Sequence, residues 1–346
     1  MRILHIMAGR GLGGAETYAT DIMLSLHASG MDQCVVMAED APRYGEIVAA
    51  GIRTVPEVLR SHFRPLQRFR LRRLLAREKP DLVHCWMRRA ASLMPHWRKG
   101  PIIGWFGGYY EPKHFKLCTH FVGVTQDIVA HMVKNKVPAG RAHYVPTFPD
   151  VKAEPPVNRA SLETPQDAWV LLALSRLHQK KGLDTLLQAA KKLQNTVVWL
   201  AGEGPLRAEL EKLAAKLGIA DRVRFLGWRT DRGALLRAAD VCVLPSRYEP
   251  FGTVILEAWA AGTPLVACRS AGPAAHVADG VNGMLAPIDD FYALAEAISR
   301  VLSDAALRSR LIAEGTATYI HSYTREAVTQ RMIGLYQTLI AEHAVP

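Results

Sequence analysis

Short apolar runs recur along the whole chain, and each is followed by a segment with apolar positions at helical spacing. Such runs predict strands buried on both faces, and the segments between them predict covering helices. The strands predicted in the first half are Arg2–Ala8, Gln33–Glu39, Leu82–Trp86, Ile102–Phe106, Phe121–Thr125 and His143–Pro146. Those predicted in the second half are Trp169–Ser175, Thr196–Gly202, Val223–Gly227, Val241–Pro245, Pro264–Cys268 and Gly283–Pro287.

The stretch from Pro146 to Pro165 separates these two arrays. It holds five prolines, mixed charges and no apolar period, which is the composition of a linker. Two successive strand–helix arrays predict an α/β protein with two Rossmann-like, doubly wound domains that face each other across a cleft. We set the domains at residues 1–150 and 151–324.

Composition limits the class of protein. The chain has 346 residues, of which 49% are hydrophobic, and no uncharged apolar stretch is long enough to span a membrane. The apolar run Ile3–Ala8 is too short for the core of a secretory signal. Five scattered cysteines without C-x-x-C spacing indicate buried thiols rather than a metal site. We therefore expect a cytoplasmic protein without a metal or other cofactor.

The net charge of +11 is concentrated in the first half of the chain. Residues 1–150 carry 21 Lys and Arg against 12 Asp and Glu, whereas residues 151–346 carry 22 against 20. A basic domain favours a polyanionic partner, which here is a phosphorylated acceptor or an anionic lipid surface at the inner face of the cell membrane. We expect no nucleic acid.

The basic stretch Arg60–Lys79 has two interpretations. It contains eight basic residues and one acidic residue, with apolar residues interleaved at helical spacing. A basic amphipathic helix can lie on anionic lipid, where each cation contributes on the order of 1 kcal/mol. The alternative is an ordinary helix that packs Leu71, Leu74 and Leu75 on the sheet and exposes its arginines to solvent.

Candidate chemistry is concentrated in Ser246–Gly262, directly after a predicted buried strand. Pro250 and Gly252 break the chain, and a helix is predicted to begin at Thr253. Glu249 then lies in a strand-to-helix loop and Glu257 about one turn into the helix, where open α/β sheets bind ligands. The exposed amides at the helix start can hold an anion, and carboxylates accept hydrogen bonds from sugar hydroxyls. This combination suits a nucleotide-sugar.

The segment E-P-F-G-T-V-I-L-E resembles the E-x7-E signature of retaining glycosyltransferases of family four, which have the GT-B fold. The resemblance implies that Glu249 holds hydroxyls of the donor sugar and Glu257 the ribose. It also implies donor contacts for the residues between them, Phe251, Gly252 and Thr253. In the GT-B fold a terminal helix, here within residues 325–346, returns to the first domain.

The segment Ser175–Gly182 is similar to the family motif [GS]-R-[LF]-x-x-x-K-G, which implies that Arg176 and Lys181 contact the donor diphosphate. Cleavage of the anomeric C–O bond leaves a nucleoside diphosphate whose negative charge grows in the transition state. Cations already in place stabilise that charge more than the ground state and so accelerate the step. We therefore predict Arg176, Lys181 and Glu249 as catalytic residues that act without a metal.

Two glycine-rich loops complete the predicted donor site. Gly202, Glu203 and Gly204 resemble the G-x-G-P loop beside the nucleotide base. Gly13 and Gly14 open a segment similar to the G-G-[AT]-E loop, which in this family touches the donor phosphate and shapes the acceptor pocket. The preceding residues also match G-x-G-x-x-G, the dinucleotide fingerprint, so an NAD(P)-dependent oxidoreductase is an alternative. That alternative leaves the two glutamates unexplained.

The acceptor side is predicted in the first half. His84, in a segment similar to P-D-[IV]-[IV]-H-x-H, is either an acceptor contact or a packed residue. Where relatives carry T-x-H-G, this chain has Phe106 in place of His, followed by Gly107, Gly108 and Tyr109, which indicates an altered acceptor pocket.

The function predicted from these features is transfer of a hexose from a UDP- or GDP-sugar to a glycan or lipid-linked acceptor in lipopolysaccharide or polysaccharide synthesis. A third possibility is a non-catalytic polyanion-binding protein on a transferase scaffold. Phe106 and His276, each at a position where relatives carry another residue, favour it.

Overall fold

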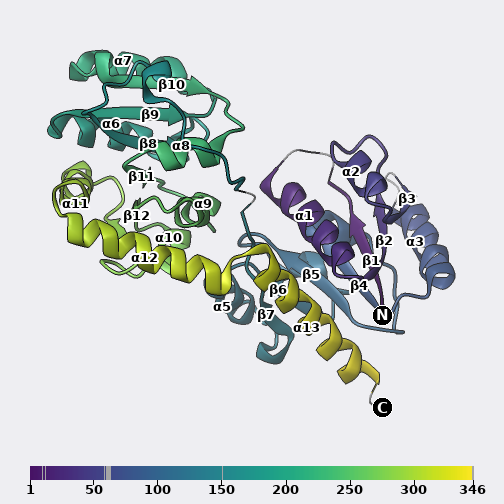
Figure 1. Cartoon of the computed structure of the whole chain (residues 1–346). Coiled ribbons are helices and arrows are strands. Elements are labelled where there is room, and N and C mark those ends of the chain that lie inside the picture. The colour runs from purple at the N-terminus through teal and green to yellow at the C-terminus, as the bar shows by residue number, and fades with distance from the viewer. Residues whose placement is uncertain (10, 12, 58, 60–63, 150, 345–346) are drawn as a thin grey trace. The chain divides into compact units, whose positions relative to one another are not determined.

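The computed structural model describes residues 1–9, 11, 13–57, 59, 64–149 and 151–344. The chain divides into two compact units, both seen in Figure 1. Unit 1 comprises Met1–Thr147 with Arg325–Pro346, and unit 2 comprises Phe148–Thr324. The sequence placed these divisions at residues 150 and 324.

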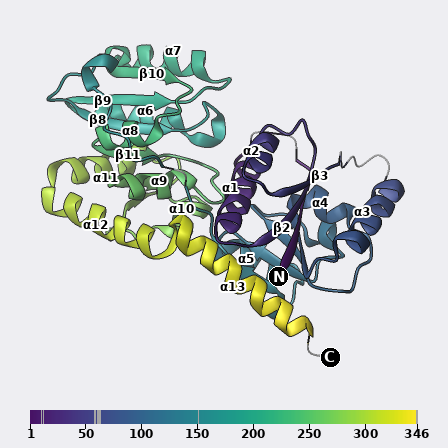
Figure 2. The ribbon, with the colours of Figure 1, turned by 45° about the vertical axis from the view of Figure 1, so that its right-hand side comes forward.

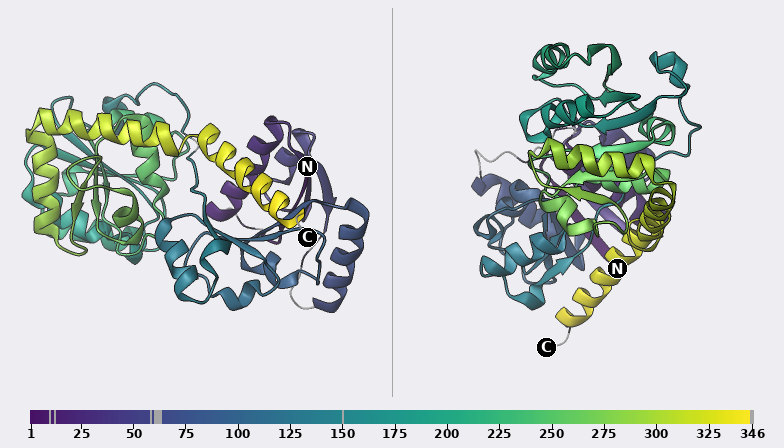
Figure 3. Two further views of the ribbon diagram at one scale, coloured as in Figure 1. Left: turned by 90° about the horizontal axis from the view of Figure 1, so that it is seen from below. Right: turned by 90° about the vertical axis from the view of Figure 1, so that its left-hand side faces the viewer.

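Unit 1 contains a seven-stranded parallel sheet with the order β3-β2-β1-β4-β5-β6-β7. Its strands are β1 (Arg2–Met7), β2 (Asp32–Met37), β3 (Arg53–Pro56), β4 (Leu82–Trp86), β5 (Ile102–Phe106), β6 (His120–Gly123) and β7 (Ala142–Tyr144). Its α-helices are α1 (Gly14–Ala28), α2 (Tyr44–Ala49), α3 (Arg64–Glu78), α4 (Met87–Leu93), α5 (Gln126–Lys134) and α13 (Arg325–Ala344). Helix α13 packs against α1 (Figure 3).

Strand β3 was not predicted from the sequence. It has four residues, occupies one edge of the sheet and is partly exposed along its length (Figure 2). An edge strand without a buried face has no apolar run, so hydrophobic patterning gives no signal for it.

Unit 2 contains a six-stranded parallel sheet with the order β10-β9-β8-β11-β12-β13. Its strands are β8 (Trp169–Leu174), β9 (Thr196–Ala201), β10 (Val223–Gly227), β11 (Val241–Leu244), β12 (Leu265–Cys268) and β13 (Met284–Ala286). Its α-helices are α6 (Leu183–Lys192), α7 (Arg207–Leu217), α8 (Arg232–Ala238), α9 (Thr253–Ala261), α10 (Ala271–His276), α11 (Phe291–Ser303) and α12 (Ala305–Ser322). All six strands predicted in this half are present.

The predicted linker is in part a packed segment of unit 2. Val157 donates a backbone hydrogen bond to the carbonyl of Ala234, and the Arg159 side chain forms an ion pair of 2.9 Å with Asp240. Arg159 also donates to two main-chain carbonyls of unit 2. A segment held by backbone and polar side-chain bonds to the rest of its own unit has no apolar period, which explains the misleading composition.

The strand order places one pair of neighbouring strands at a reversal point in each unit. These pairs are β1 with β4 in unit 1 and β8 with β11 in unit 2. Successive strands then extend outward on either side, so the loops after the two central strands diverge at the carboxyl edge of the sheet. Open α/β sheets bind ligands at this position.

None of the helices in the described part of the chain combines the length and the apolar character needed to cross a bilayer.

Candidate active site

Main-chain hydrogen bonds connect the loops after β8, β9 and β11 in unit 2. The amide of Leu177 donates to the carbonyl of Glu203 at 3.0 Å, and the carbonyl of Leu177 accepts from Leu206 at 3.1 Å. The carbonyl of Lys180 accepts from the amides of Arg247 and Tyr248 at 2.9 and 3.1 Å. The loops at the reversal point thus form one connected surface.

Two glycines are required by the close approach of these loops. Gly182 has a φ of +61°, and a Cβ atom there would lie 2.1 Å from the carbonyl oxygen of Pro245. Gly202 has a φ of +150°, and its Cβ would lie 2.0 Å from the carbonyl oxygen of Ser175. Any side chain at either position would clash with backbone that has no room to move. Packing therefore explains Gly202, and its predicted donor contact remains a prediction, as do those of Glu203 and Gly204.

Lys181 and Glu249 meet at the reversal point. The Lys181 Nζ atom lies 2.5 Å from Oε2 of Glu249, and the two side chains are only 24% and 15% exposed. Lys181 ends the short 3-10 turn Gln179–Lys181 after β8, and Glu249 lies in the loop after β11. Residues 68 positions apart in sequence are therefore brought together as a half-buried ion pair.

Arg176 lies on the same loop as Lys181 but is exposed. Its guanidinium forms no hydrogen bond or ion pair with any residue that the structure describes. Unlike Lys181, Arg176 is not joined to either glutamate in this structure, so its predicted contact with a ligand is not tested by side-chain geometry.

Arg247, which was not predicted from the sequence, connects three loops. Its guanidinium binds both carboxylate oxygens of Asp184 at 2.9 and 2.7 Å and Oδ1 of Asp289 at 2.6 Å. It also donates to the carbonyl of Gln179 at 2.8 Å. Burial of Asp184 acts to raise its pKa, but the hydrogen bonds and charge of Arg247 together with backbone amides outweigh it, so the pKa of that carboxyl is lowered. The only sequence signal is an arginine two residues before Glu249.

Glu257 is fully buried on α9, which begins at Thr253 as predicted. The Nη1 atom of Arg232 lies 2.8 Å from Oε1 of Glu257, but no described donor is aligned to form a hydrogen bond with either carboxylate oxygen. Burial raises the pKa of Glu257, and the charge of Arg232 opposes that effect. Arg232 was not predicted because only the fold brings α8 beside α9.

The start of α9 is held by the next loop along the sheet. The amide of Gly272 donates to the carbonyl of Glu249 at 2.6 Å, and a Cβ at Gly272 would lie 2.3 Å from the carbonyl oxygen of Phe251. Phe251 is buried edge-on against the ring of His276 at 4.7 Å, and Gly252 takes a φ of +89° directly before the helix. Phe251 therefore has a packing role, and the predicted donor contacts of Phe251, Gly252 and Thr253 remain predictions.

His276 is a packed residue. Its Nδ1 atom is 3.0 Å from the hydroxyl of Tyr323, and burial lowers its pKa to about 4. Its ring also packs edge-on against Phe251, so the imidazole is part of the core around the start of α9.

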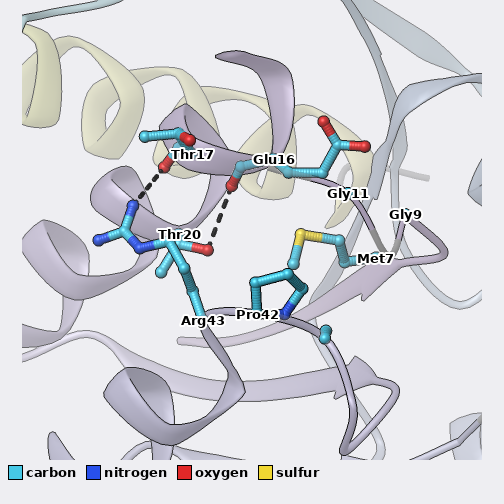
Figure 4. Close-up of a pocket in the computed structure, with 9 residues that line it drawn as sticks. Met7, Gly9, Gly11, Glu16, Thr17, Thr20, Pro42 and Arg43 are labelled. Carbon is cyan, nitrogen blue, oxygen red and sulfur yellow. Dashed lines mark hydrogen bonds between the residues drawn. The ribbon is translucent and has the colours of Figure 1, made fainter. Parts of the chain in front are cut away.

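The glycine loop of unit 1 surrounds a carboxylate of its own chain. A Cβ at Gly9 or Gly13 would lie 2.6 or 2.7 Å from a carboxylate oxygen of Glu16. The small pocket beside the loop, about 10 Å³, is lined in part by Arg43, which donates to the carbonyl of Thr17 (Figure 4). This volume is enough for about one water molecule. A dinucleotide diphosphate would need the place at the start of α1 that Glu16 occupies, which argues against the oxidoreductase alternative.

His84 is a packed residue in this structure, as in the second of its two interpretations, and its predicted contact with an acceptor remains a prediction. The imidazole is fully buried, its Nδ1 atom lies 2.6 Å from the hydroxyl of Tyr336, and its ring stacks on Trp86 at 4.1 Å. Burial holds the pKa of His84 well below its usual value. In this structure the imidazole is therefore held between Trp86 and Tyr336 of the same unit.

The loop after β5 contains the remaining acceptor-side residues. Gly107 and Gly108 precede Tyr109, whose hydroxyl donates to Asp127 and whose ring contacts His131 edge-on at 5.3 Å. Phe106 is fully buried against Phe115 at 4.2 Å. An aromatic core residue therefore stands where relatives carry a histidine.

Groups of three or more His, Cys, Asp or Glu side chains placed to hold a metal ion do not occur among the described residues.

Comparison with known proteins decides the family. Residues 156–318 match the model of glycosyl transferases group 1, and residues 12–153 match that of Glycosyltransferase Family 4. The chain is 34% identical over 341 residues to the lipopolysaccharide core biosynthesis glycosyltransferase LpsE of Rhizobium meliloti (strain 1021), covering 97% of this chain and 98% of that relative. This chain belongs to the group 1, family four glycosyltransferases.

A second relative and a solved structure agree with this assignment. The glycosyltransferase LpsD of the same organism, also named for lipopolysaccharide core biosynthesis, is 33% identical over 347 residues, or 99% of this chain and 100% of the relative. The crystal structure of Anabaena Alr3699/HepE in complex with UDP and glucose has a TM-score of 0.81 at 21% identity, covering 98% of this chain and 100% of that one. The GT-B fold class and the prediction of a glycosyltransferase are confirmed.

Proposed function

We propose that this glycosyltransferase transfers a hexose from a nucleotide diphosphate-sugar to a hydroxyl group of a glycan or lipid-linked acceptor, with retention at the anomeric carbon and an α-linkage in the product. The names of LpsE and LpsD support a step in lipopolysaccharide synthesis, because both relatives match almost the whole chain. The UDP and glucose bound by Anabaena HepE, which shares the fold, support a nucleotide-sugar donor.

The ion pair of Lys181 with Glu249 is the observation that carries this proposal. It puts a cation suited to a diphosphate beside a carboxylate suited to sugar hydroxyls, at the reversal point of the sheet in unit 2. In the proposed complex the diphosphate replaces Glu249 as the ion-pair partner of Lys181. The carboxylate of Glu249 then accepts hydrogen bonds from the sugar hydroxyls. Each ionic group exchanges one partner for another, so neither is left buried and unpaired.

Lys181 and Arg176 are proposed to stabilise the departing diphosphate. The negative charge on the leaving group increases as the anomeric C–O bond breaks, so cations held next to it lower the barrier more than they strengthen ground-state binding. These two cations take the place of a metal in this proposal. Arg247 supports this arrangement, because its ion pair with Asp184 and its hydrogen bond to Gln179 connect the loop of Glu249 to that of Lys181. Its ion pair with Asp289 adds the loop after β13.

Glu257 is proposed to bind the ribose. A buried carboxylate without hydrogen-bond donors is costly, and two ribose hydroxyls supply donors of the required kind. The half-exposed side chain of Arg232 then shifts to admit the nucleotide while it continues to offset the charge.

Unit 1 is proposed to bind the acceptor through the loop after β5, with Gly107, Gly108 and Tyr109, and through Gly13 and Gly14. Its helix α3 is proposed to contact an anionic membrane surface. Leu71, Leu74 and Leu75 are buried, as in the ordinary-helix interpretation, but the outer face exposes arginines together with Leu66 and Phe69, which are 47% and 58% exposed. Residues 60–63 of the basic stretch lie outside the described residues.

A thermal-unfolding panel with UDP, GDP, ADP and CMP tests the donor site. One nucleoside diphosphate is expected to raise the midpoint, since a ligand at 100 times its Kd adds about 2.7 kcal/mol of stability. Glu257→Gln is expected to abolish most of the rise, whereas Glu209→Gln, an exposed residue of α7, leaves it unchanged. Equal responses of these two variants, or no response of the wild-type protein to any nucleotide, would contradict the proposal.

A further inference from the structure

A second pocket in unit 1 lies between the edge strand β3 and helix α3, apart from the glycine loop. Its volume is about 330 Å³, within the range of small-molecule sites. Val55, Leu71 and Leu74 supply its apolar surface. The position at the sheet edge means that β2 and β3 lie on one side of the helix and solvent on the other (Figure 1).

The helical repeat explains why this pocket is both apolar and basic. Arg70, Arg73 and Arg77 are three and four residues apart, so they lie in one row along α3. Leu71 and Leu74, which occupy the adjacent row, are buried toward the sheet. The result is an apolar floor with a line of guanidinium groups at its rim.

The charges around the pocket are not balanced. Arg70 is paired with Glu57 at 2.8 Å, which also lines the pocket. Arg77 and Arg53 share the single carboxylate of the buried Glu78, at 2.8 and 2.9 Å. Arg73 forms no ion pair with a described carboxylate and lies over the ring of Phe69 at 5.9 Å.

These four arginines therefore face two carboxylates. The surplus of two positive charges is located at the rim, where Arg73 has no acidic partner and Arg77 has only a share in one. An anion at this rim would be attracted by both groups, and the nearby apolar floor reduces the competition from water.

We propose that this pocket binds the phosphate group of an anionic amphiphile, with the phosphate at Arg73 and Arg77 and the adjoining apolar part on Val55, Leu71 and Leu74. Guanidinium groups bind phosphate oxygens in pairs of parallel hydrogen bonds, and two of them match a doubly charged monoester. The exposed Leu66 and Phe69 continue the apolar surface along the same helix. The site does not depend on the proposed transfer reaction, but it gives the proposed membrane contact of α3 a specific location.

Binding of dihexanoyl phosphatidic acid below its micelle concentration, measured by isothermal titration calorimetry, tests the pocket. The full-length protein is expected to bind this probe more tightly than inorganic phosphate and not to bind dihexanoyl phosphatidylcholine. Arg73→Gln is expected to weaken binding by about 10-fold or more, as for the loss of hydrogen bonds to a charged group.

Arg72→Gln is the matched control, because Arg72 is exposed on the same helix and does not line the pocket. This substitution lowers the net charge by the same amount as Arg73→Gln. It is expected to alter the affinity less than twofold. Equal losses for the two variants would show a diffuse basic surface and overturn the pocket. Equal affinities for inorganic phosphate and the amphiphile would overturn the apolar subsite.

Phosphatidylcholine vesicles with and without phosphatidic acid show whether the phosphate that binds the pocket belongs to a membrane lipid or to a free ligand. Vesicle binding that depends on phosphatidic acid and is weakened by Arg73→Gln but not by Arg72→Gln supports a lipid headgroup. Binding of the soluble probe without any vesicle binding would overturn the membrane location and leave a free phosphorylated ligand. Nucleotide-induced stabilisation of Arg73→Gln is expected to equal that of the wild-type protein, so failure of the pocket is separable from failure of the donor site.

Discussion

The reversal points of the two sheets have the same topology but different chemistry. In unit 2 the loops bring Lys181 into an ion pair with Glu249. Glu257, which belongs to the same sequence motif as Glu249, is buried on α9. In unit 1 the glycine loop encloses Glu16, and His84 on β4 is part of an aromatic core. The comparison teaches that a doubly wound sheet provides the position of a site, whereas the side chains on its loops decide which chemistry occurs there.

The largest expected effect comes from Lys181→Ala in unit 2. Loss of a preorganised charge that stabilises the leaving group is expected to lower kcat by about 10²–10³-fold, or about 3–4 kcal/mol. Steady-state transfer or donor hydrolysis measures this. Lys212→Ala, an exposed residue of α7, serves as the control. Wild-type turnover of Lys181→Ala would remove the basis for locating the reaction in unit 2.

Arg247→Gln should destabilise unit 2 and disturb its site together. The change leaves Asp184 and Asp289 without their cation. A hydrogen bond to a charged group contributes about 1.5–3 kcal/mol to stability. Because Arg247 is a quarter exposed, we expect a loss near the lower end of that range, about 2 kcal/mol. Urea unfolding compares it with Arg269→Gln, which breaks an exposed pair with Asp279 and should cost under about 1 kcal/mol. Equal losses would show that Arg247 does not connect the loops.

Acid should destabilise unit 1 through His5. Burial lowers the pKa of His5 to about 3, so the folded state keeps it neutral while the unfolded chain takes up a proton below pH 6.5. This contribution is present above pH 6.5 and is lost as pH falls toward 3, by about 1.4 kcal/mol per pH unit, or about 2 kcal/mol at pH 5. Urea unfolding at pH 7 and pH 5 measures it, and His5→Asn should show a shallower dependence. An identical pH dependence of the variant would exclude His5 as the cause.

The smallest expected effect is that of Tyr336→Phe. It removes the hydroxyl that bonds His84 and leaves a buried ring nitrogen without a partner, at a cost of about 1–2 kcal/mol. Turnover per folded molecule should not change, because His84 is packed between Trp86 and Tyr336 and has a structural role. A selective fall in kcat at unchanged stability would restore a role for His84 in the reaction and reduce the contrast between the two units.

Much of the fold could be predicted because parallel strands buried on both faces must be apolar throughout. Five strands of unit 2 and most of those of unit 1 have this pattern, whereas the edge strand β10 is largely half-buried. Strand β3 lacks it, because an edge strand is partly exposed. The start of the helix at Thr253 could also be predicted from its neighbours in sequence, since Pro250 and Gly252 break the chain before it.

The residues that occupy the site were only partly determined by the sequence. The resemblance to family motifs singled out Glu249, Glu257 and Lys181, because each motif is a short run of consecutive residues. The partners of these residues depend on distant parts of the chain. Arg247 joins Asp184 from 63 residues away, and Tyr336 buries His84 from 252 residues away. Local periodicity records whether a side chain is buried, but tertiary folding alone decides which charge or hydroxyl lies next to it.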